Sequence, residues 1–392
     1  PGGVGYDINC GVRMMTTNLT AEEVYDRAEQ LANILFQKVP SGLGKGSVAD
    51  IDRQELDEVL NRGMEWAVEH GYAVEDDLEH CEDEGRRPDA QPSKISDKAK
   101  ERGANQLGSL GSGNHFLEVQ KVSELYDTET ARKFGLHDDQ VVVLIHCGSR
   151  GLGHQVCSDY LREIERNHEE VLDRLPDKEL AYAPAGSQLA EDYYGAMCAS
   201  INFAWTNRQL IMHQVRQCFE RIFDQSWEEM DMNLLYDVAH NIAKKEEHRV
   251  DGTTKELYVH RKGSTRAFPR ERDEVPAAYR STGQPVLIPG SMGTSSYILR
   301  GGERSMDTTF GSTAHGAGRL MSRTQAKNDY YGRDVQDRLK RQKIIVKAQS
   351  GATIAEEAPE VYKDVDEVVE VSDSLGIGRK VARTFPIVNV KG

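Results

Sequence analysis

The chain has 392 residues, of which 38% are hydrophobic, and a formal charge of −15. This length suits one large domain or two to three ordinary ones, with enough apolar residues for a substantial core. No apolar run approaches the roughly 20 residues that a membrane span needs, and the six cysteines show neither a CxxC pair nor the spacing of a disulfide framework. We therefore expect a globular, cytoplasmic protein without a membrane segment.

Taken in chain order, the hydrophobic pattern alternates between helical stretches and short β-branched runs. Helices are predicted at 20–36, 52–70, 155–172, 188–223 and 313–342, the first of them opened by a capping box at Thr20. Strands are predicted at 141–146, 256–260, 285–289, 343–347 and 367–371. No internal repeat and no linker divides the sequence. The expected fold class is therefore mixed α/β (α+β), with residues 1–392 forming one compact catalytic domain.

The charge is unevenly distributed along the chain. Residues 50–90 carry 15 acidic and 4 basic side chains, whereas 240–272 carry 9 basic and 5 acidic ones and 319–347 carry 9 and 3. Because Lys and Arg drive binding to phosphates, the overall acidity argues against a nucleic-acid partner, but the two basic stretches leave RNA open. Within the acidic segment, we expect 75–93 to be a mobile excursion from the domain.

Three of the predicted strands run directly into polar, glycine-rich loops. VVVLIH (141–146) leads into CGSRGLGH, ELYVH (256–260) into RKGS, and PVLIP (285–289) into GSMGTSS. Ligands often bind beyond strand ends, where glycines let backbone N–H groups approach phosphate oxygens, so the repetition predicts one shared pocket. SGLGKGS (41–47) is not a phosphate-binding P-loop, because its spacing is wrong and it follows a helix.

PGGVGYDINCGVR (1–13) places Asp7 and Cys10 three residues apart in a glycine-rich loop. On their own these two residues fit a capped turn and a buried structural cysteine, but a carboxylate and a thiolate together also bind divalent cations. Similar Gly- or Asn-neighboured positions, in GSLGSGNHFLE, HCGSRGLGH and HNIAKKEEH, hold His115, His146 and His240. The five side chains predict a site for Mn, Zn, Fe or Co, with a slight preference for Mn.

His315 lies in GSTAHGAGR (311–319), among small residues that leave an imidazole accessible. A neutral imidazole can attack phosphorus and form a phosphoramidate, while metals and an arginine such as Arg319 neutralise the charge on the oxygens. A buried polar histidine in a tight turn is the alternative interpretation. His315 is thus a candidate nucleophile.

Together these stretches resemble the RtcB family of RNA ligases. The matching segments, in family order along the whole chain, are PGGVGYDINCGVR, VPSGLGKGS, GSLGSGNHFLE, HCGSRGLGH, DVAHNIAKKEEH, HRKGSTRAFP, IPGSMGTSSY, STAHGAGRLMSR, YKDVDEVV and the final VKG. Each match alone is modest, but ten of them in order are specific. The family has a further N-terminal segment ahead of PGGVGYDINCG, which this sequence does not contain.

The resemblance implies an enzyme that joins RNA ends bearing a 2′,3′-cyclic phosphate or 3′-phosphate to ends bearing a 5′-hydroxyl, with GTP and two Mn²⁺ ions. It implies that a histidine is guanylylated first, that GMP passes to the RNA 3′-phosphate, and that the 5′-hydroxyl then expels GMP. The implied substrates are tRNA halves or other broken RNA ends, in tRNA splicing or RNA repair. Archease is an implied partner.

Carried over to this sequence, the resemblance assigns the guanylylated nucleophile to His315. One manganese is assigned to Asp7, Cys10 and His115, and the other to Cys10, His146 and His240, with the Cys10 sulfur shared. For GTP the resemblance implies Asn114, Glu118, Ser291, His315, Ala317, Tyr362 and Lys391. Of these, Glu118 is suited to accept hydrogen bonds from guanine. RNA phosphate is assigned to Arg150, with Lys262 and Arg266 as further candidates.

Two other functions are compatible with part of the pattern. A dinuclear metal phosphoesterase would use the same metal ligands but needs neither a covalent guanylate nor a guanine pocket, so His315, Glu118 and Lys391 favour the ligase. An inactive RNA-binding fragment would tolerate the loss of metal ligands, yet all of them are present.

Overall fold

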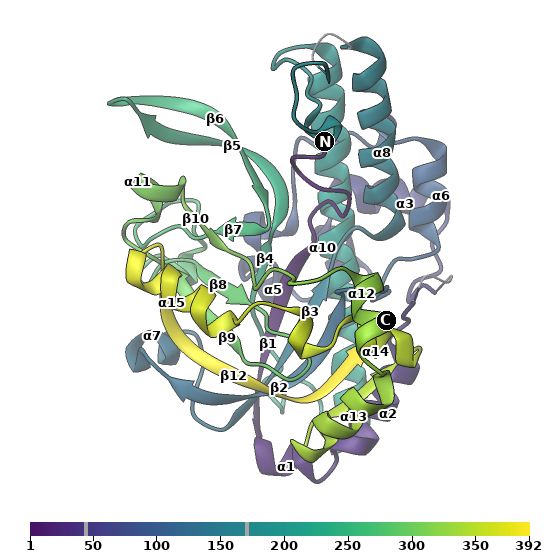
Figure 1. Ribbon diagram of the computed structural model, residues 1–392, viewed down its shortest axis with the longest axis vertical. Helices are drawn as coiled ribbons and strands as arrows, with labels where there is room; N and C mark the ends of the chain where they lie inside the picture. The colour runs from purple at the N-terminus through teal and green to yellow at the C-terminus, as the bar shows by residue number, and fades with distance from the viewer. Residues whose placement is uncertain (43–45, 169–171) are drawn as a thin grey trace.

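A computed structural model describes residues 1–42, 46–168 and 172–392 of the chain (Figure 1). The centre of this described part is an eight-stranded sheet in the order β4-β1-β3-β2-β12-β9-β8, with β11 beside β12. Its strands are β1 (Gly11–Thr20), β2 (Phe116–Leu125), β3 (Gln140–Cys147), β4 (Leu234–Ala239), β8 (Pro285–Ile288), β9 (Ser296–Gly301), β11 (Ile345–Ala348) and β12 (Gly378–Lys391). Neighbouring strands run antiparallel, except that β11 runs parallel to β12.

Helices flank this sheet and extend beyond it at the top of Figure 1, where α8 and α10 lie side by side. The α-helices are α1 (Ala21–Tyr25), α2 (Ala28–Lys38), α3 (Arg53–Arg62), α4 (Met64–Glu69), α5 (Glu75–Glu79), α6 (Asp97–Ala104), α7 (Thr128–Lys133), α8 (Arg150–Asn167), α10 (Gln188–Phe223), α11 (Ser305–Thr309), α12 (Arg323–Asp329), α13 (Gly332–Arg341), α14 (Gly351–Glu356) and α15 (Val365–Leu375). Short 3₁₀ turns are η1 (Glu82–Gly85), η2 (Pro92–Lys94), η3 (Lys178–Leu180), η4 (Ala277–Tyr279) and η5 (Pro359–Val361). Of the described helices, none is long and apolar enough to cross a membrane.

Two small sheets lie beside the large one. The hairpin of β5 (Asn241–Val250) and β6 (Thr253–Lys262) projects from the body of the molecule in Figure 1, and β7 (Ser264–Arg266) pairs with β10 (Ser312–Ala314). The predicted mixed α/β class is confirmed, with helices and strands around a single large sheet.

Strand β3 shows why a continuous apolar run forms a strand here. Its side chains alternate between two hydrophobic clusters: Val141, Val143 and Ile145 pack with α2 and α10, whereas Val142 and Leu144 face the opposite side. Because the strand is central and buried on both faces, it shows no polar alternation. The predicted strand is confirmed, with one residue more at each end.

The other predicted elements agree with the structure to different degrees. The helix predicted at 188–223 is confirmed without change as α10, and the three later strands at 256–260, 285–289 and 343–347 fall in β6, β8 and β11. The predictions 20–36 and 52–70 each contain two helices, and the second break lies at Gly63, whose φ is +56°. The helix predicted at 155–172 begins earlier, at Arg150. Residues 43–45 of SGLGKGS and 169–171 lie outside the described residues.

One predicted element is confirmed only in its second part, and another is wrong. The segment 313–342, predicted to be one helix, begins with strand β10 and an irregular loop that contains HGAG, and helices α12 and α13 follow. The first of these helices starts after Ser322, whose hydroxyl accepts a hydrogen bond from the backbone N–H of Gln325. The strand predicted at 367–371 lies inside α15. Its β-branched residues fit a helix because Asp364 caps the first turn and the buried side chains recur with helical spacing.

Several side chains of the acidic stretch 75–93 pack into the protein, and the mobility predicted for this stretch stays a prediction. Asp77 is buried against Arg216, whose guanidinium donates two hydrogen bonds of 2.9 Å. Glu82 is fully buried, and its carboxylate accepts from Lys244 Nζ at 2.6 Å and from the backbone N–H of Ala239 at 2.9 Å. Buried carboxylates require partners of this kind. Two of the acidic side chains in this segment therefore form internal ion pairs, and Glu82 also holds the end of β4 through the N–H of Ala239.

Candidate functional site

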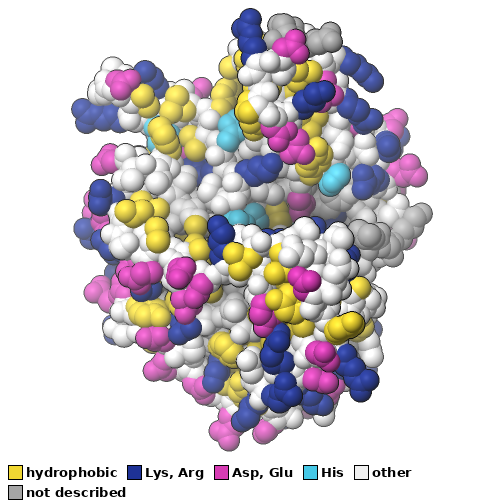
Figure 2. Space-filling view, in the orientation of Figure 1, with side chains coloured by type: hydrophobic (Ala, Val, Ile, Leu, Met, Phe, Trp, Pro, Cys, Tyr) yellow, Lys and Arg dark blue, Asp and Glu magenta, His cyan; other side chains and the backbone are white. Residues whose placement is uncertain are grey.

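Four neighbouring strands bring candidate ligands to one edge of the sheet. The ligands are His240 after β4, Cys10 before β1, His146 near the end of β3 and His115 before β2. The antiparallel register aligns these strand ends, since Gly11 pairs with Ala239 on one side and with Cys147 on the other. In Figure 2, histidine side chains lie in a hollow of the molecular surface with Lys and Arg side chains near its rim.

The five predicted metal ligands meet in two groups that share Cys10. Cys10 Sγ lies 3.5 Å from His115 Nε2 and 3.3 Å from His146 Nε2. His115 Nε2 lies 2.8 Å from Asp7 Oδ2, and His146 Nε2 lies 3.2 Å from His240 Nε2. Within each group the ligand atoms are all within 4.8 Å of one another. The structure thus brings together both predicted ligand sets.

The surroundings of these ligands direct their donor atoms inward. Leu110 O lies 3.0 Å from His115 Nδ1, and Asn114 O lies 3.1 Å from His146 Nδ1, so in both rings Nε2 faces the cluster. Backbone partners of this kind orient metal-binding imidazoles. Gly148 lies so close to the Asp7 carboxylate that a Cβ would collide with it. The arrangement of thiol, imidazole and carboxylate donors fits divalent transition metals.

The acidic ligands differ in how readily they ionise. Burial alone would raise the pKa of Asp7, but the neighbouring His115 and Arg150 hold it at about 2. Burial raises the pKa of the Cys10 thiol to about 12. A bound cation favours the thiolate strongly, so coordination would deprotonate Cys10.

His315 joins this cluster to a pocket. It opens the loop of residues 315–322, named here the His315 loop, and its ring centroid lies 4.6 Å from that of His240. His315 also lines a pocket beside the ligand cluster, together with side chains from several distant segments of the chain. Burial lowers the pKa of His315, so its imidazole is neutral at neutral pH.

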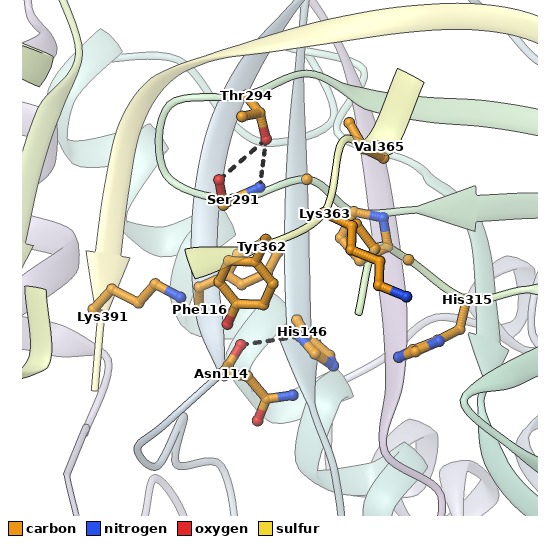
Figure 3. Close-up of a pocket in the computed structure, with 14 residues that line it drawn as sticks. Asn114, Phe116, His146, Ser291, Thr294, His315, Tyr362, Lys363, Val365 and Lys391 are labelled. Atoms are coloured by element: carbon orange, nitrogen blue, oxygen red, sulfur yellow. Dashed lines mark hydrogen bonds between the residues drawn. The ribbon is translucent and has the colours of Figure 1, made fainter. Parts of the chain in front are cut away.

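The pocket is lined by most of the residues that the resemblance assigns to GTP. They are Asn114, Ser291, His315, Ala317, Tyr362 and Lys391. In Figure 3, Lys391 and His315 enter from opposite sides, with Tyr362 and Phe116 between them. Ser291 N donates a hydrogen bond of 2.8 Å to the Thr294 hydroxyl, which shapes the loop after β8.

Sequence reasoning missed several residues that line this pocket. They include Phe116, Pro289, Thr294, Lys363 and Val365. Their signal in the sequence is adjacency, since each stands within or beside a stretch that carries a predicted site residue. The aromatic ring next to a metal ligand at position 116 is the clearest such signal.

Glu118 differs from the other residues predicted to bind GTP. It is fully buried on β2, two residues beyond Phe116, and does not line the pocket. Gln120 and Asn389 donate hydrogen bonds to its carboxylate. Burial raises the pKa of Glu118 to about 7, against the opposing effect of the Lys391 charge. Glu118 therefore lies behind the pocket wall.

The three predicted RNA contacts lie in different surroundings. Arg150 begins α8 with a left-handed φ of +54°, and its Nη1 lies 3.5 Å from His115 Nδ1. Lys262 ends the β5–β6 hairpin with a half-exposed side chain. Arg266 is buried, and its Nε lies 3.5 Å from a Glu82 oxygen. Arg266 therefore belongs to the internal ion-pair network, and its contact with RNA phosphate stays a prediction.

Comparison with known proteins assigns the chain to a family. A family model described as tRNA-splicing ligase RtcB matches residues 1–392. The chain belongs to this family. It is 52% identical to the tRNA-splicing ligase RtcB of Methanococcus maripaludis, 54% identical to that of Thermococcus kodakarensis and 53% identical to that of Archaeoglobus fulgidus. These similarities cover 100% of this chain and 82%, 81% and 81% of the respective relatives. Family membership confirms the resemblance drawn from the ten sequence motifs.

Proposed function

We propose that the protein is an RNA ligase that uses GTP and Mn²⁺ to join RNA 2′,3′-cyclic phosphate or 3′-phosphate ends to 5′-hydroxyl ends, in tRNA splicing or RNA repair. Family membership supports an RNA ligase. One structural observation carries the mechanism: His315 lines the pocket while its ring packs against His240, a member of one ligand group. A single side chain therefore adjoins both a place for a nucleotide and a place for a cation.

His315 has the properties of a nucleophile towards phosphorus. Its lowered pKa leaves a neutral imidazole with an available lone pair. Attack on the α-phosphorus of GTP forms an N–P bond as the P–O bond to pyrophosphate breaks, which leaves a guanylylated histidine. Water first opens a 2′,3′-cyclic phosphate at its bond to O2′, which gives a 3′-phosphate and a 2′-hydroxyl. An oxygen of the RNA 3′-phosphate then attacks the phosphorus of the guanylylated histidine, and the N–P bond to His315 breaks as GMP passes to the RNA. In the last step the 5′-hydroxyl loses its proton, attacks the activated phosphate and expels GMP.

The two ligand groups fit a pair of divalent cations beside this nucleophile. Asp7, Cys10 and His115 would hold one cation, and Cys10, His146 and His240 would hold the other. The Asp7 carboxylate of the first group suits Mn²⁺, whereas the second group offers thiol and imidazole donors. Bound there, the cations would offset negative charge on phosphate oxygens and on the leaving pyrophosphate.

Side chains around the pocket offer what a guanine nucleotide requires. The Asn114 amide can donate hydrogen bonds, and the Lys391 ammonium can pair with phosphate. Phe116 and Tyr362 present rings against which a base can stack. Glu118 is the acceptor that we assign to guanine N1–H and N2–H₂. Because it lies behind the pocket wall, this contact requires the wall to open to the carboxylate and Gln120 and Asn389 to release it.

Covalent labelling tests this proposal. The protein is incubated with Mn²⁺ and GTP labelled at the α-phosphate, then denatured and assayed for bound label. We expect an acid-labile adduct that is absent from His315→Ala and retained in His137→Ala, a matched change of an exposed histidine. Label that persists in His315→Ala would contradict the assigned nucleophile. Metal-dependent hydrolysis of phosphate esters without any adduct would favour a dinuclear phosphoesterase instead.

A further inference from the structure

A single buried carboxylate, Glu357, meets four side chains beside the proposed nucleotide pocket. It follows helix α14 and is fully buried. One of its oxygens lies 3.1 Å from Arg319 Nη1 and 3.4 Å from Arg323 Nε. The other accepts a hydrogen bond from the Tyr362 hydroxyl and lies 3.8 Å from Lys391 Nζ.

These partners come from separate parts of the chain. Arg319 belongs to the His315 loop, Tyr362 follows η5, and Lys391 ends β12. Tyr362 and Lys391 both line the pocket, whereas Glu357 does not. Glu357 therefore connects the loop that carries His315 with two polar groups of the pocket wall.

Backbone hydrogen bonds close the same junction. Leu320 N donates to Val361 O at 2.7 Å, and Lys363 N donates to Gly318 O at 2.8 Å. Between these two bonds, Arg319 donates through Nη2 to Glu356 O at 2.6 Å. The His315 loop is thus attached to the segment after α14 at a place where the Arg319 side chain is itself held by Glu357.

The cationic side chains at this junction need the negative charge of Glu357. It is one anion among three cationic side chains, of which Lys391 is buried, Arg319 is mostly buried and Arg323 is half exposed. Charges of like sign repel one another when their counter-ion is removed. Burial alone would raise the pKa of Glu357, but Lys391, Tyr362 and the arginines lower it, so the group stays ionised. The remaining positive charge near the pocket suits a phosphate ligand.

We propose that Glu357 is a positioning residue that holds Arg319, Tyr362 and Lys391 so that the His315 loop and the pocket wall keep one arrangement. Glu357 acts through these three side chains, because it does not itself line the pocket. The inference rests on the proposed function for the identity of the ligand, GTP. The coupling of loop and wall is a property of the ligand-free chain.

Hydrogen exchange on the ligand-free protein tests this coupling. Glu357→Gln keeps the side-chain shape but removes the anion that pairs with Arg319 and Lys391. We expect exchange at the Leu320 and Lys363 amides to accelerate by about tenfold, because local opening costs less free energy when the junction is weakened. Unchanged exchange at both amides would overturn the positioning role.

The adjacent residue provides a matched control. The Glu356 side chain pairs with Lys327 Nζ at 3.0 Å, away from the pocket. Glu356→Gln therefore removes a carboxylate from the same helix end and should leave exchange in the His315 loop at the parental rate. If Glu357→Gln does not fold, Tyr362→Phe removes one of the hydrogen bonds to Glu357 and should accelerate exchange by a smaller factor.

Nucleotide dependence shows whether the coupling serves the pocket. In Glu357→Gln we expect the GTP concentration for half-maximal His315 labelling to rise by about tenfold, in line with the loss of hydrogen bonds to a charged group. The labelling rate at saturating GTP should fall less. Parental GTP dependence in this variant would contradict the inference. A parent chain without any adduct, together with the predicted change in exchange, would refute the proposed function and leave the positioning role supported.

Discussion

The metal-ligand cluster and the wall of the nucleotide pocket are held in place in different ways. The ligands stand at the ends of β4, β1, β3 and β2, whose positions are set by ladders of backbone hydrogen bonds. The part of the wall formed by the His315 loop and Tyr362 depends on a few backbone bonds and on the charged side chains that meet at Glu357, whereas Lys391 of the same wall stands on β12 of the sheet. We therefore expect changes in the sheet to disturb folding and metal binding, and changes in the wall to alter nucleotide binding by degrees.

The largest effect should come from Asp237, which holds the sheet edge. It is fully buried and accepts from Arg13 Nε at 2.7 Å and from Arg208 Nε at 2.8 Å. Arg208 also donates to the carbonyl of Asn9, in the turn before β1, and to that of Cys147, the last residue of β3, and each of these residues is next to a metal ligand. Asp237→Ala leaves two buried cations without their anion, so we expect the free energy of unfolding to fall by about 3–5 kcal/mol in urea titrations.

An exposed ion pair provides the control for this change. Asp97→Ala removes the partner of Arg53 on the surface and should leave the urea midpoint almost unaltered. Equal losses in Asp97→Ala and Asp237→Ala would show that burial of the charge is not the cause.

Metal binding should respond strongly to the shared ligand. Cys10→Ser removes a donor from both ligand groups, so we expect affinity for both Mn²⁺ ions to fall by about 100-fold or more, since losing even an outer partner costs about 10–100-fold. Titration calorimetry measures affinity and stoichiometry together. Cys218→Ser changes another buried thiol, which contacts Ile34 O. This variant should bind Mn²⁺ with the affinity of the parent. Loss of only one ion from Cys10→Ser would contradict the sharing of its sulfur.

The affinity of the pocket for GTP should depend on pH through Glu118. Glu118 must be ionised to accept hydrogen bonds from guanine, and its pKa is about 7. Affinity for GTP should therefore rise by about tenfold from pH 6 to pH 8, as the protonated fraction falls. Lys391, whose pKa is lowered by burial, faces the same carboxylate and limits the rise at high pH. A binding titration at several pH values should show the dependence in the parent and not in Glu118→Gln.

The raised pKa of Glu118 also makes the free energy of unfolding depend on pH in a defined direction. The pKa of Glu118 in the folded chain lies above its ordinary value of 4.5. Its contribution to the free energy of unfolding is therefore fully present below about pH 4.5 and is lost as the pH rises through about 7. Unfolding of the parent and of Glu118→Gln, measured across this pH range, checks the direction. If the free energy of unfolding of the parent rises with pH relative to that of the variant, the predicted sign is wrong.

The smallest effect concerns a helix cap next to the wall. Ser350 caps α14, and its hydroxyl accepts from Thr353 N at 3.2 Å. Ser350→Ala should lower the free energy of unfolding by about 0.5–1 kcal/mol and raise the GTP requirement for labelling less than Glu357→Gln does. Thermal unfolding and the labelling assay measure both. A change in Mn²⁺ stoichiometry would contradict the separation of the two regions.

Strand β3 and helix α15 show how far local pattern reaches in predicting this fold. VVVLIH predicts a strand because its continuous apolar side chains need burial on both faces, which a central strand provides. EVVEV has the same β-branched character, but Asp364 caps a helix there and Val365 and Val369 share its buried face. The long strand β12 was missed because Arg and Lys interrupt its pattern. Its pairing with β2 and β9, which is not local in sequence, decides its conformation.

The amino-acid sequence by itself determined which side chains carry the chemistry. Thiol, imidazole and carboxylate groups in glycine-rich loops indicated a metal site and a histidine nucleophile, and the order of the motifs indicated the family that the comparisons confirm. The type of each of these side chains and the residues next to it can be read directly from the local sequence.

Only the tertiary structure decided how these groups meet. Cys10 and His115 are 105 residues apart, and their contact depends on strand register, which follows from the folding of the whole sheet. The burial of Glu118, the internal ion pairs of Arg266 and the central place of Glu357 also depend on packing between distant segments. Such packing sets the desolvation cost of each charge, and that cost determines whether a charged residue faces a ligand or an internal partner.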